Sequence, residues 1–287
     1  MDIKILVCFH KDSVIISDDI YTPIHVGKSN SQIQLPMIGD NTGDNISELN
    51  GLFCELTGLY WGWKNLNADY IGLSHYRRLF AFPSFRDFCD SIKNRITYLG
   101  YKLYFTLTRP SAIFMGYSYV RKINNENILK KSSDSFTKEL RRHIEQHPET
   151  KAFALKPVRI GNLTNYYFFS SVSGGKHIDF AETVTKDLFP HLYPYLEKTL
   201  RDNKLYYANM VIMKKDVLDD YCTFLFGVLM KHFNWCLEEK IVSSIEDKAI
   251  SRLMGYIAEV LTSAYILYLK DLYGKSSVKL LTMIKYE

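Results

Sequence analysis

The residues best suited to bind an anion lie at the end of one short apolar segment. Residues 69–74 (DYIGLS) read as a strand, and His75, Tyr76, Arg77 and Arg78 follow it directly. Ligands of α/β proteins sit at the carboxyl ends of strands, and arginine can hold a phosphate through two parallel hydrogen bonds. We therefore expect this cluster to bind a ligand, with the two arginines on a diphosphate. The alternative is a surface turn whose arginines pair with acidic residues.

Further polar candidates lie upstream of this strand. His10 and Lys11 follow the apolar run Ile3–Phe9, which reads as a buried first strand. Residues 13–51 have weak periodicity, so we expect mostly loop there, and a loop of that length is usually functional or disordered. The candidates in its turn-rich part are Asp40, Asp44 and Asn45. Such residues can also bond their own backbone and hold tight turns.

A helix is expected over Phe53–Leu66, where apolar residues recur at helical spacing. Glu55, Gly58 and Gly62 share another face of this helix. Each glycine inside a helix costs roughly 1 kcal/mol relative to alanine. That cost indicates close approach of a ligand or close packing on a strand. Glu55 could bind a ligand there, although an acid near a helix start is also favoured by the helix dipole.

The remaining pattern predicts an α/β protein with one main domain, residues 1–287. Further strands are expected at Phe153–Val158 and Tyr206–Lys214, and helices at His177–Thr185, Val217–Leu237 and Glu246–Leu272. We expect a mixed, mostly parallel central sheet flanked by helices. Residues 84–151 read as a basic, aromatic and partly helical insertion, and 217–287 as a C-terminal helical part.

The charge distribution, the absent motifs and the cysteine spacing exclude several classes of protein. The net charge is +5, and residues 84–151 carry 13 Lys+Arg against 7 Asp+Glu, so this segment holds the whole positive excess. No P-loop, G-x-G-x-x-G, H-E-x-x-H or G-x-S-x-G motif occurs. The five cysteines are scattered and form no C-x-x-C, which argues against a disulfide framework and a zinc site and fits a reducing cytoplasm.

Four segments in sequence carry a family resemblance: DIYTPIHVG (19–27), GDNTGDNIS (39–47), FCELTGLYWGWKNL (53–66) and DYIGLSHYRRLF (69–80). Together they resemble the DUF4422 glycosyltransferases of bacterial capsule, exopolysaccharide and O-antigen clusters. Later features are also similar, namely Lys156-Pro157, the tyrosines 166–167, His177 and Asp179, Asn209-Met210, Tyr221-Cys222 and R-x-x-G-x-x-x-E at 252–259. The resemblance departs from the family at Glu259-Val260-Leu261, where Glu-Arg-Leu is expected.

The resemblance implies a GT-A-like fold and a hexosyltransferase. The donor would be a UDP-sugar, with galactose in pyranose or furanose form favoured, and the acceptor a glycan, expected to be lipid-linked. On this basis the donor-binding residues would be His10, Lys11, Asp40, Asn45, Glu55, His75, Tyr76, Arg77 and Arg78. The acceptor-binding residues would be His177, Asn209 and Arg252.

An inverting transferase needs a carboxylate base that takes the proton of the acceptor hydroxyl. The candidates are Glu259, Asp247 and Asp44. Glu259 lies in an otherwise apolar helix, where a carboxylate needs a partner or a function, and a structural pair with Arg252 is the alternative. Asp247 could instead complement the dipole at a helix start.

No D-x-D, the usual metal ligand of GT-A transferases, occurs in the chain. The metal neutralises the diphosphate leaving group, and cationic side chains can do the same electrostatic work. We therefore expect no metal ligands and no cofactor, with Mn²⁺ or Mg²⁺ not favoured.

Basic and aromatic residues interleave over 94–122, as in segments that lie on anionic membranes. We expect a cytoplasmic protein, with peripheral attachment to the inner face of the cell membrane through this segment. A basic subdomain or an oligomer surface is the alternative. For the whole chain, a non-catalytic carbohydrate-binding protein remains the competing hypothesis. A nucleic-acid partner is not expected, because the charge excess is small and no recognised nucleic-acid-binding motif occurs.

Overall fold

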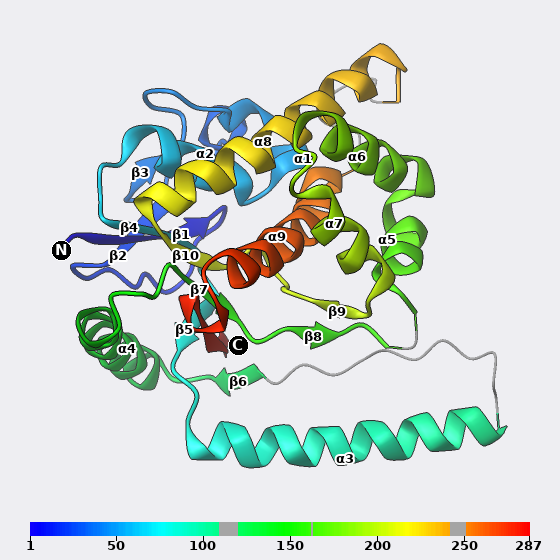
Figure 1. Cartoon of the computed structure of the whole chain (residues 1–287). Coiled ribbons are helices and arrows are strands. Elements are labelled where there is room, and N and C mark those ends of the chain that lie inside the picture. Colours follow the sequence, from blue (N-terminus) through cyan, green and yellow to red (C-terminus); the bar gives the residue numbers. More distant parts are fainter. Residues whose placement is uncertain (109–119, 162, 242–250) are drawn as a thin grey trace.

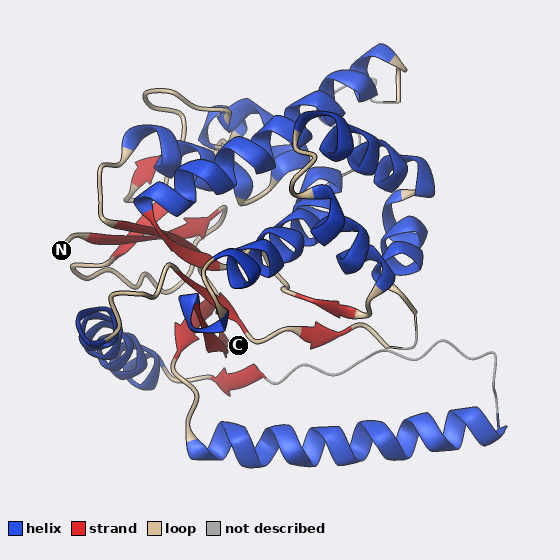
Figure 2. Cartoon of the chain, in the orientation of Figure 1, coloured by secondary structure: helices blue, strands red, loops and turns tan. Residues whose placement is uncertain are grey.

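One mixed sheet runs through the centre of the protein, with helices on both of its faces (Figures 1 and 2). The structure is a computed structural model and describes residues 1–108, 120–161, 163–241 and 251–287. The strands of the sheet are β1 (Ile3–Phe9), β2 (Tyr21–His25), β3 (Ile38–Gly39), β4 (Tyr70–His75), β5 (Arg78–Ala81), β6 (Val120–Ile123), β7 (Ala152–Leu155), β10 (Val211–Lys214) and β11 (Val278–Tyr286). Two short strands, β8 (Val158–Arg159) and β9 (Lys204–Leu205), pair separately.

The sheet has a parallel half and a mixed half. β3, β2, β1 and β4 pair in that order, all parallel. Beyond them β10 pairs antiparallel with both β4 and β7, and β11 pairs parallel with β7 and β6 but antiparallel with β5. The predicted mixed sheet flanked by helices is therefore confirmed.

β1 is buried on both faces, as parallel strands between helical layers usually are. Ile5 and Val7 point into one hydrophobic cluster, whereas Leu6 and Cys8 point into the other. Because the side-chain period of a strand is 2, one continuous apolar run serves both clusters. The strand predicted at these residues is confirmed with the same bounds.

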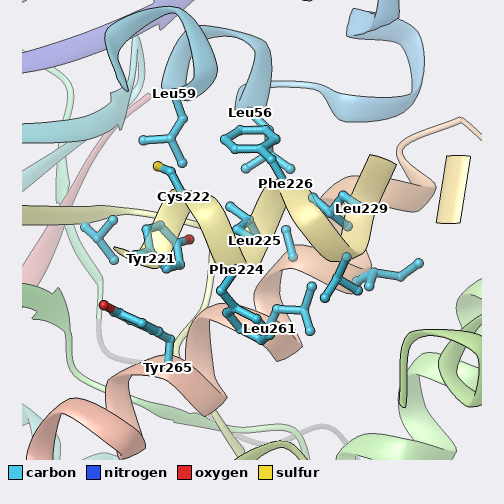
Figure 3. Packing of buried hydrophobic residues seen from close by; sticks show 14 of the residues in the cluster. Leu56, Leu59, Tyr221, Cys222, Phe224, Leu225, Phe226, Leu229, Leu261 and Tyr265 are labelled. Carbon is cyan, nitrogen blue, oxygen red and sulfur yellow. The ribbon is translucent and has the colours of Figure 1, made fainter. Parts of the chain in front are cut away.

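Most helices cover one face of the sheet and build the larger cluster. They are α1 (Asn50–Phe53), α2 (Leu56–Asn65), α5 (Asn165–Ser173), α6 (Gly175–Leu188), α7 (Tyr193–Arg201), α8 (Lys215–Glu238) and α9 (Leu253–Leu272). At its centre Phe224 and Leu225 of α8 lie between α2 and α9, as Figure 3 shows. On the other face α4 (Glu126–Gln146) buries Leu129, Phe136 and Leu140.

The glycines of α2 allow this helix to pack tightly on the parallel half of the sheet. A Cβ atom at Gly58 would lie 2.9 Å from the Cys8 Sγ atom, and one at Gly62 would lie 2.5 Å from Leu6 Cδ1. Of the two explanations for these glycines, close packing on a strand is the one that the contacts support.

Some predicted elements end or break elsewhere. Cys54, with φ 52°, separates α1 from α2 within the expected helix 53–66. The expected strand 206–214 is strand only from Val211, because Ala208 and Asn209 have positive φ. Residues 13–51, expected to be mostly loop, contain β2 and β3.

The range 84–151 contains two kinds of structure. Its first helix, α3 (Phe85–Thr108), lies apart from the sheet along its whole length (Figure 1). In contrast, β6 joins the sheet and α4 covers one of its faces, so both belong to the main fold. The C-terminal range 217–287 is helical only as far as α9, because β11 then returns into the sheet. Residues 109–119 and 246–250 of the expected segments, including the catalytic candidate Asp247, lie outside the described residues.

Candidate active site

A cleft opens where the carboxyl ends of β1 and β4 lie side by side. Cys8 and His75 stand opposite each other in the register of these two strands. The cleft beside them has a volume of about 470 Å³. It is lined by Glu55, Arg78, Val158, Arg159, Ile160, Phe168, Val172, Leu205, Tyr207, Ala208, Arg252, Tyr256 and Glu259. These residues come from segments far apart in the sequence, which meet only in the folded chain.

A tight turn at Ala208 and Asn209 forms one wall of the cleft, and four hydrogen bonds fix it. The Ala208 N–H donates to Glu259 Oε1 at 3.0 Å, and the Ala208 carbonyl lies 3.0 Å from His75 Nε2. Asn209 Nδ2 donates to Glu55 Oε1 at 2.9 Å and to the Gly255 carbonyl at 3.2 Å. The turn therefore ties both cleft carboxylates to one short segment.

Unusual backbone conformations gather around this cleft. Among the described residues five non-glycine residues have positive φ, and four of them are Cys54, Ala208, Asn209 and Arg252. Such conformations cost about 1–3 kcal/mol each and persist only where the surrounding structure fixes them, often at functional sites. The side chain of Asn209 is buried, and its Oδ1 has no hydrogen-bond partner in the protein.

Glu259 has the most suitable electrostatics for a general base. Burial, the largest cause, and the nearby Glu55 raise its pKa to about 7, against the opposing effects of the Ala208 N–H, Arg78 and Arg252. A carboxyl group with a pKa near neutrality can both accept and release a proton at physiological pH. The hydrogen bond from the Ala208 N–H gives the Glu259 carboxylate a partner, and its catalytic role stays a prediction.

Cationic and aromatic side chains face the two carboxylates across the same cleft. The Arg78 guanidinium lies 5.7 Å from the Tyr207 ring centre, and the Arg252 guanidinium lies 5.7 Å from the Tyr256 ring centre. Arg159 is held by a 2.7 Å hydrogen bond to Asn203 Oδ1. Three guanidinium groups in one cleft can neutralise a diphosphate.

The residues that follow β1 and β4 continue this positive surface. The ring centres of His10 and Tyr76 lie 5.2 Å apart, and Lys11 and Arg77 approach the same Tyr76 ring. Burial lowers the pKa of His10, and the positive charges around it, including that of Arg252, lower it further. His75 lies 4.0 Å from Glu55, and burial lowers its pKa too. An anion bound here would reduce the electrostatic repulsion among these cationic side chains.

Three of the expected ligand-binding residues instead hold the loop after β3. Asp40 is fully buried and accepts hydrogen bonds from the backbone N–H groups of Gly27 and Lys28 and from the Ser47 hydroxyl. Asn45 Oδ1 accepts from the Ser47 N–H. Asp44 is exposed and accepts from the Tyr60 hydroxyl. None of the three lines the cleft. Their contacts are explained by the alternative given above, namely that these residues hold tight turns of the loop.

His177 lies in a buried cluster between α6 and α8, away from the residues that line the cleft. Its Nδ1 is 2.9 Å from His232 Nε2, and burial lowers the pKa of both rings. Together with Cys236, these are the residues of the described chain whose side chains could jointly hold a metal ion, with ligand atoms within 4.8 Å of one another. No contact of His177 supports the acceptor-binding role.

The cleft also contains residues that sequence reasoning missed. Tyr256 lies four residues after Arg252 and three before Glu259, so helical spacing places all three on one face. The sequence alone could therefore have identified Tyr256. Arg159, Phe168 and Tyr207 come from other segments, and no spacing in the sequence connects them to α9.

The fold resembles that of a glycosyltransferase. The whole chain matches the apo structure of the bifunctional glycosyltransferase WbbM with a TM-score of 0.78 and 26% sequence identity, and the match covers 46% of the WbbM chain. The chain thus spans about half the length of that protein. No curated protein matches the chain.

The model of the family described as "Domain of unknown function (DUF4422)" matches residues 4–270, and the chain belongs to this family. The resemblance based on the four N-terminal motifs is therefore confirmed.

Proposed function

We propose that the protein is a glycosyltransferase that moves a hexose, with galactose favoured, from a UDP-sugar to a glycan acceptor in bacterial surface polysaccharide synthesis. Two findings support transfer chemistry: the similarity in fold to WbbM and the convergence of carboxylates and arginines in one cleft. The donor, the sugar and a lipid-linked acceptor rest on the resemblance of the motifs to the DUF4422 glycosyltransferases.

The observation that carries the proposal is Glu259, a carboxyl group with a pKa of about 7 in a cleft that also contains three arginines. In an inverting transfer, the acceptor hydroxyl attacks the anomeric carbon and the bond from that carbon to the diphosphate oxygen breaks. Glu259 takes the hydroxyl proton, and UDP leaves with the electron pair of the broken bond. A base with a pKa near the working pH suits this step.

The leaving diphosphate gains negative charge in that step, and preorganised cations stabilise such charge. Arg78 and Arg252 could do this, because they line the same cleft as Glu55 and Glu259 and lie close enough to lower the pKa of Glu259. His10, Lys11 and Arg77 extend the positive surface towards the strand ends, where we place the nucleotide. Catalysis without a metal ion is part of this proposal.

The experiment is calorimetric titration of the protein with UDP and UDP-galactose, with and without Mn²⁺, on wild type and Arg252→Ala. Because Arg252 lines the cleft, we expect metal-independent binding that weakens at least tenfold in the variant, about 1.4 kcal/mol. Lys186→Ala, which removes a surface cation elsewhere, is the matched control and should bind as wild type does.

Each other outcome has a defined meaning. Binding only with Mn²⁺ would keep the enzyme class and reject the metal-independent mechanism. Binding of free glycan without affinity for any nucleotide would reject the transferase and favour the non-catalytic carbohydrate-binding protein. Equal binding by Arg252→Ala and wild type would place the donor outside this cleft.

Within the described residues, no helix is both long enough and apolar enough to cross a membrane.

A further inference from the structure

The most exposed apolar surface of the described residues lies on α3. Its large apolar side chains follow one another at spacings of three and four residues, in the order Phe85, Phe88, Ile92, Ile96, Leu99, Leu103 and Leu107. At 100° per residue they fall within a stripe about 100° wide. Each is exposed, from 44% at Ile92 to 81% at Phe85. Contiguous exposed apolar patches of this kind mark interaction sites.

Two contacts turn the stripe away from the rest of the protein. Asp87 is fully buried and forms a 2.7 Å ion pair with Arg121 of β6. Further along, the Tyr98 hydroxyl donates to the Gly161 carbonyl at 3.4 Å. Both residues lie roughly opposite the stripe on the helix. The helix is therefore fixed to the body by its polar side, and Figure 1 shows it lying apart from the sheet.

The charges on α3 are arranged by sign around the stripe. Arg95 and Lys102 border it on one side and Lys93 on the other, whereas Asp87 and Asp90 lie on the far face. Helices that lie in the surface of anionic membranes carry cations along both borders of their apolar face in this way. Each cation contributes electrostatic attraction to the lipid headgroups.

The charges beside the stripe argue against a second copy of the chain as the occupant. A left-handed coiled coil needs apolar residues at both core positions of a seven-residue repeat. The apolar pattern alone would allow one, with Phe85, Ile92 and Leu99 at one core position and Cys89, Ile96 and Leu103 at the other. The positions that flank this core, however, hold Lys93, Arg95 and Lys102 and no acidic residue, so two paired copies would bring like charges together.

We infer that α3 is a membrane-docking helix that lays its apolar stripe into the surface of an anionic lipid bilayer. Tyr98 connects it to the segment beside Ile160, which lines the cleft. Docking through α3 would thus hold the cleft close to the membrane surface. The inference concerns attachment alone, so it stands or fails independently of the proposed transfer reaction.

The test is cosedimentation of the full chain with vesicles of phosphatidylcholine, with or without phosphatidylglycerol. Wild type should bind the anionic vesicles, and binding should weaken in neutral vesicles and at high salt. The variant Ile96→Glu/Leu103→Glu should lose at least tenfold in partitioning. Thr97→Glu/Tyr101→Glu places the same two charges at exposed positions of the same helix outside the stripe, and it should still bind.

Thermal unfolding of the variants serves as the folding control, since α3 contributes little to the buried core. Unchanged vesicle binding by the stripe variant, in a protein that unfolds as wild type does, would overturn the inference. So would light scattering that shows a wild-type dimer which the stripe variant dissociates, because the stripe would then be an interface between copies.

Discussion

Replacing Glu259 by glutamine should change the pH dependence of stability. Burial raises the pKa of this carboxyl group from its ordinary 4.5 to about 7 in the folded protein. Each pKa unit corresponds to about 1.4 kcal/mol, so ionising Glu259 in the cleft costs the folded state about 3 kcal/mol relative to the unfolded chain. Glutamine has nearly the same shape, can still accept from the Ala208 N–H and carries no charge.

The sign of the effect follows from the raised pKa. Below about pH 4.5 the side chain is protonated in both the folded and unfolded states, so wild type and Glu259→Gln should have similar stability. As the pH rises to 7, the unfolded chain ionises first and wild type loses stability. Above pH 7 the variant should therefore be more stable by about 3 kcal/mol.

Urea unfolding of both proteins between pH 4.5 and pH 8 measures this difference, because contributions from other groups cancel between them. Glu145→Gln, at an exposed position of α4, is a suitable control and should follow wild type at every pH. A difference between wild type and Glu259→Gln that stays constant with pH would refute the claim that the Glu259 pKa is raised.

Further measurements test the electrostatics and the packing. Because cations surround His10, binding of the UDP anion should raise the pKa of His10 and cause proton uptake near neutral pH. NMR titration of the ring protons can follow this change. An unchanged His10 pKa would place the nucleotide elsewhere. Gly72→Ala should destabilise the protein by about 1–3 kcal/mol, because its Cβ would lie 2.9 Å from the Val211 backbone oxygen. Gly62→Ala should cost less in the same unfolding assay, since its Cβ would meet only the mobile end of Leu6 and alanine favours the helix.

The sequence alone was enough to predict two strands of the parallel half, β1 and β4, but not β2 and β3, which lie in a range expected to be mostly loop. β1 and β4 are short apolar runs that end in polar clusters, and such runs identify buried strands without any tertiary information. The break at Cys54 and the turn at Ala208 could not be predicted, because their positive φ angles are held by contacts with Arg252, Glu259 and other distant residues.

The candidate site was predicted in part. Glu55, Arg78, Arg252 and Glu259 were identified by residue type and position, and the structure brings them together in one cleft. Asp40 was misleading, because a buried carboxylate that holds backbone N–H groups cannot be distinguished in the sequence from one that binds a ligand.

The position of α3 illustrates a different limit. Its composition indicated a basic and aromatic segment, but the ordering of apolar, basic and acidic residues around the helix becomes informative only when the helix bounds are known. Those bounds, and the contacts of Asp87 and Tyr98 with the body, come from the structure.

A crystal structure of the protein with UDP bound would show directly where the donor nucleotide lies. We expect the diphosphate within hydrogen-bonding distance of Arg252 or Arg78, with Glu259 accessible from the open side of the cleft. A nucleotide bound at another surface, with the cleft empty, would contradict the assignment of this cleft as the site of glycosyl transfer.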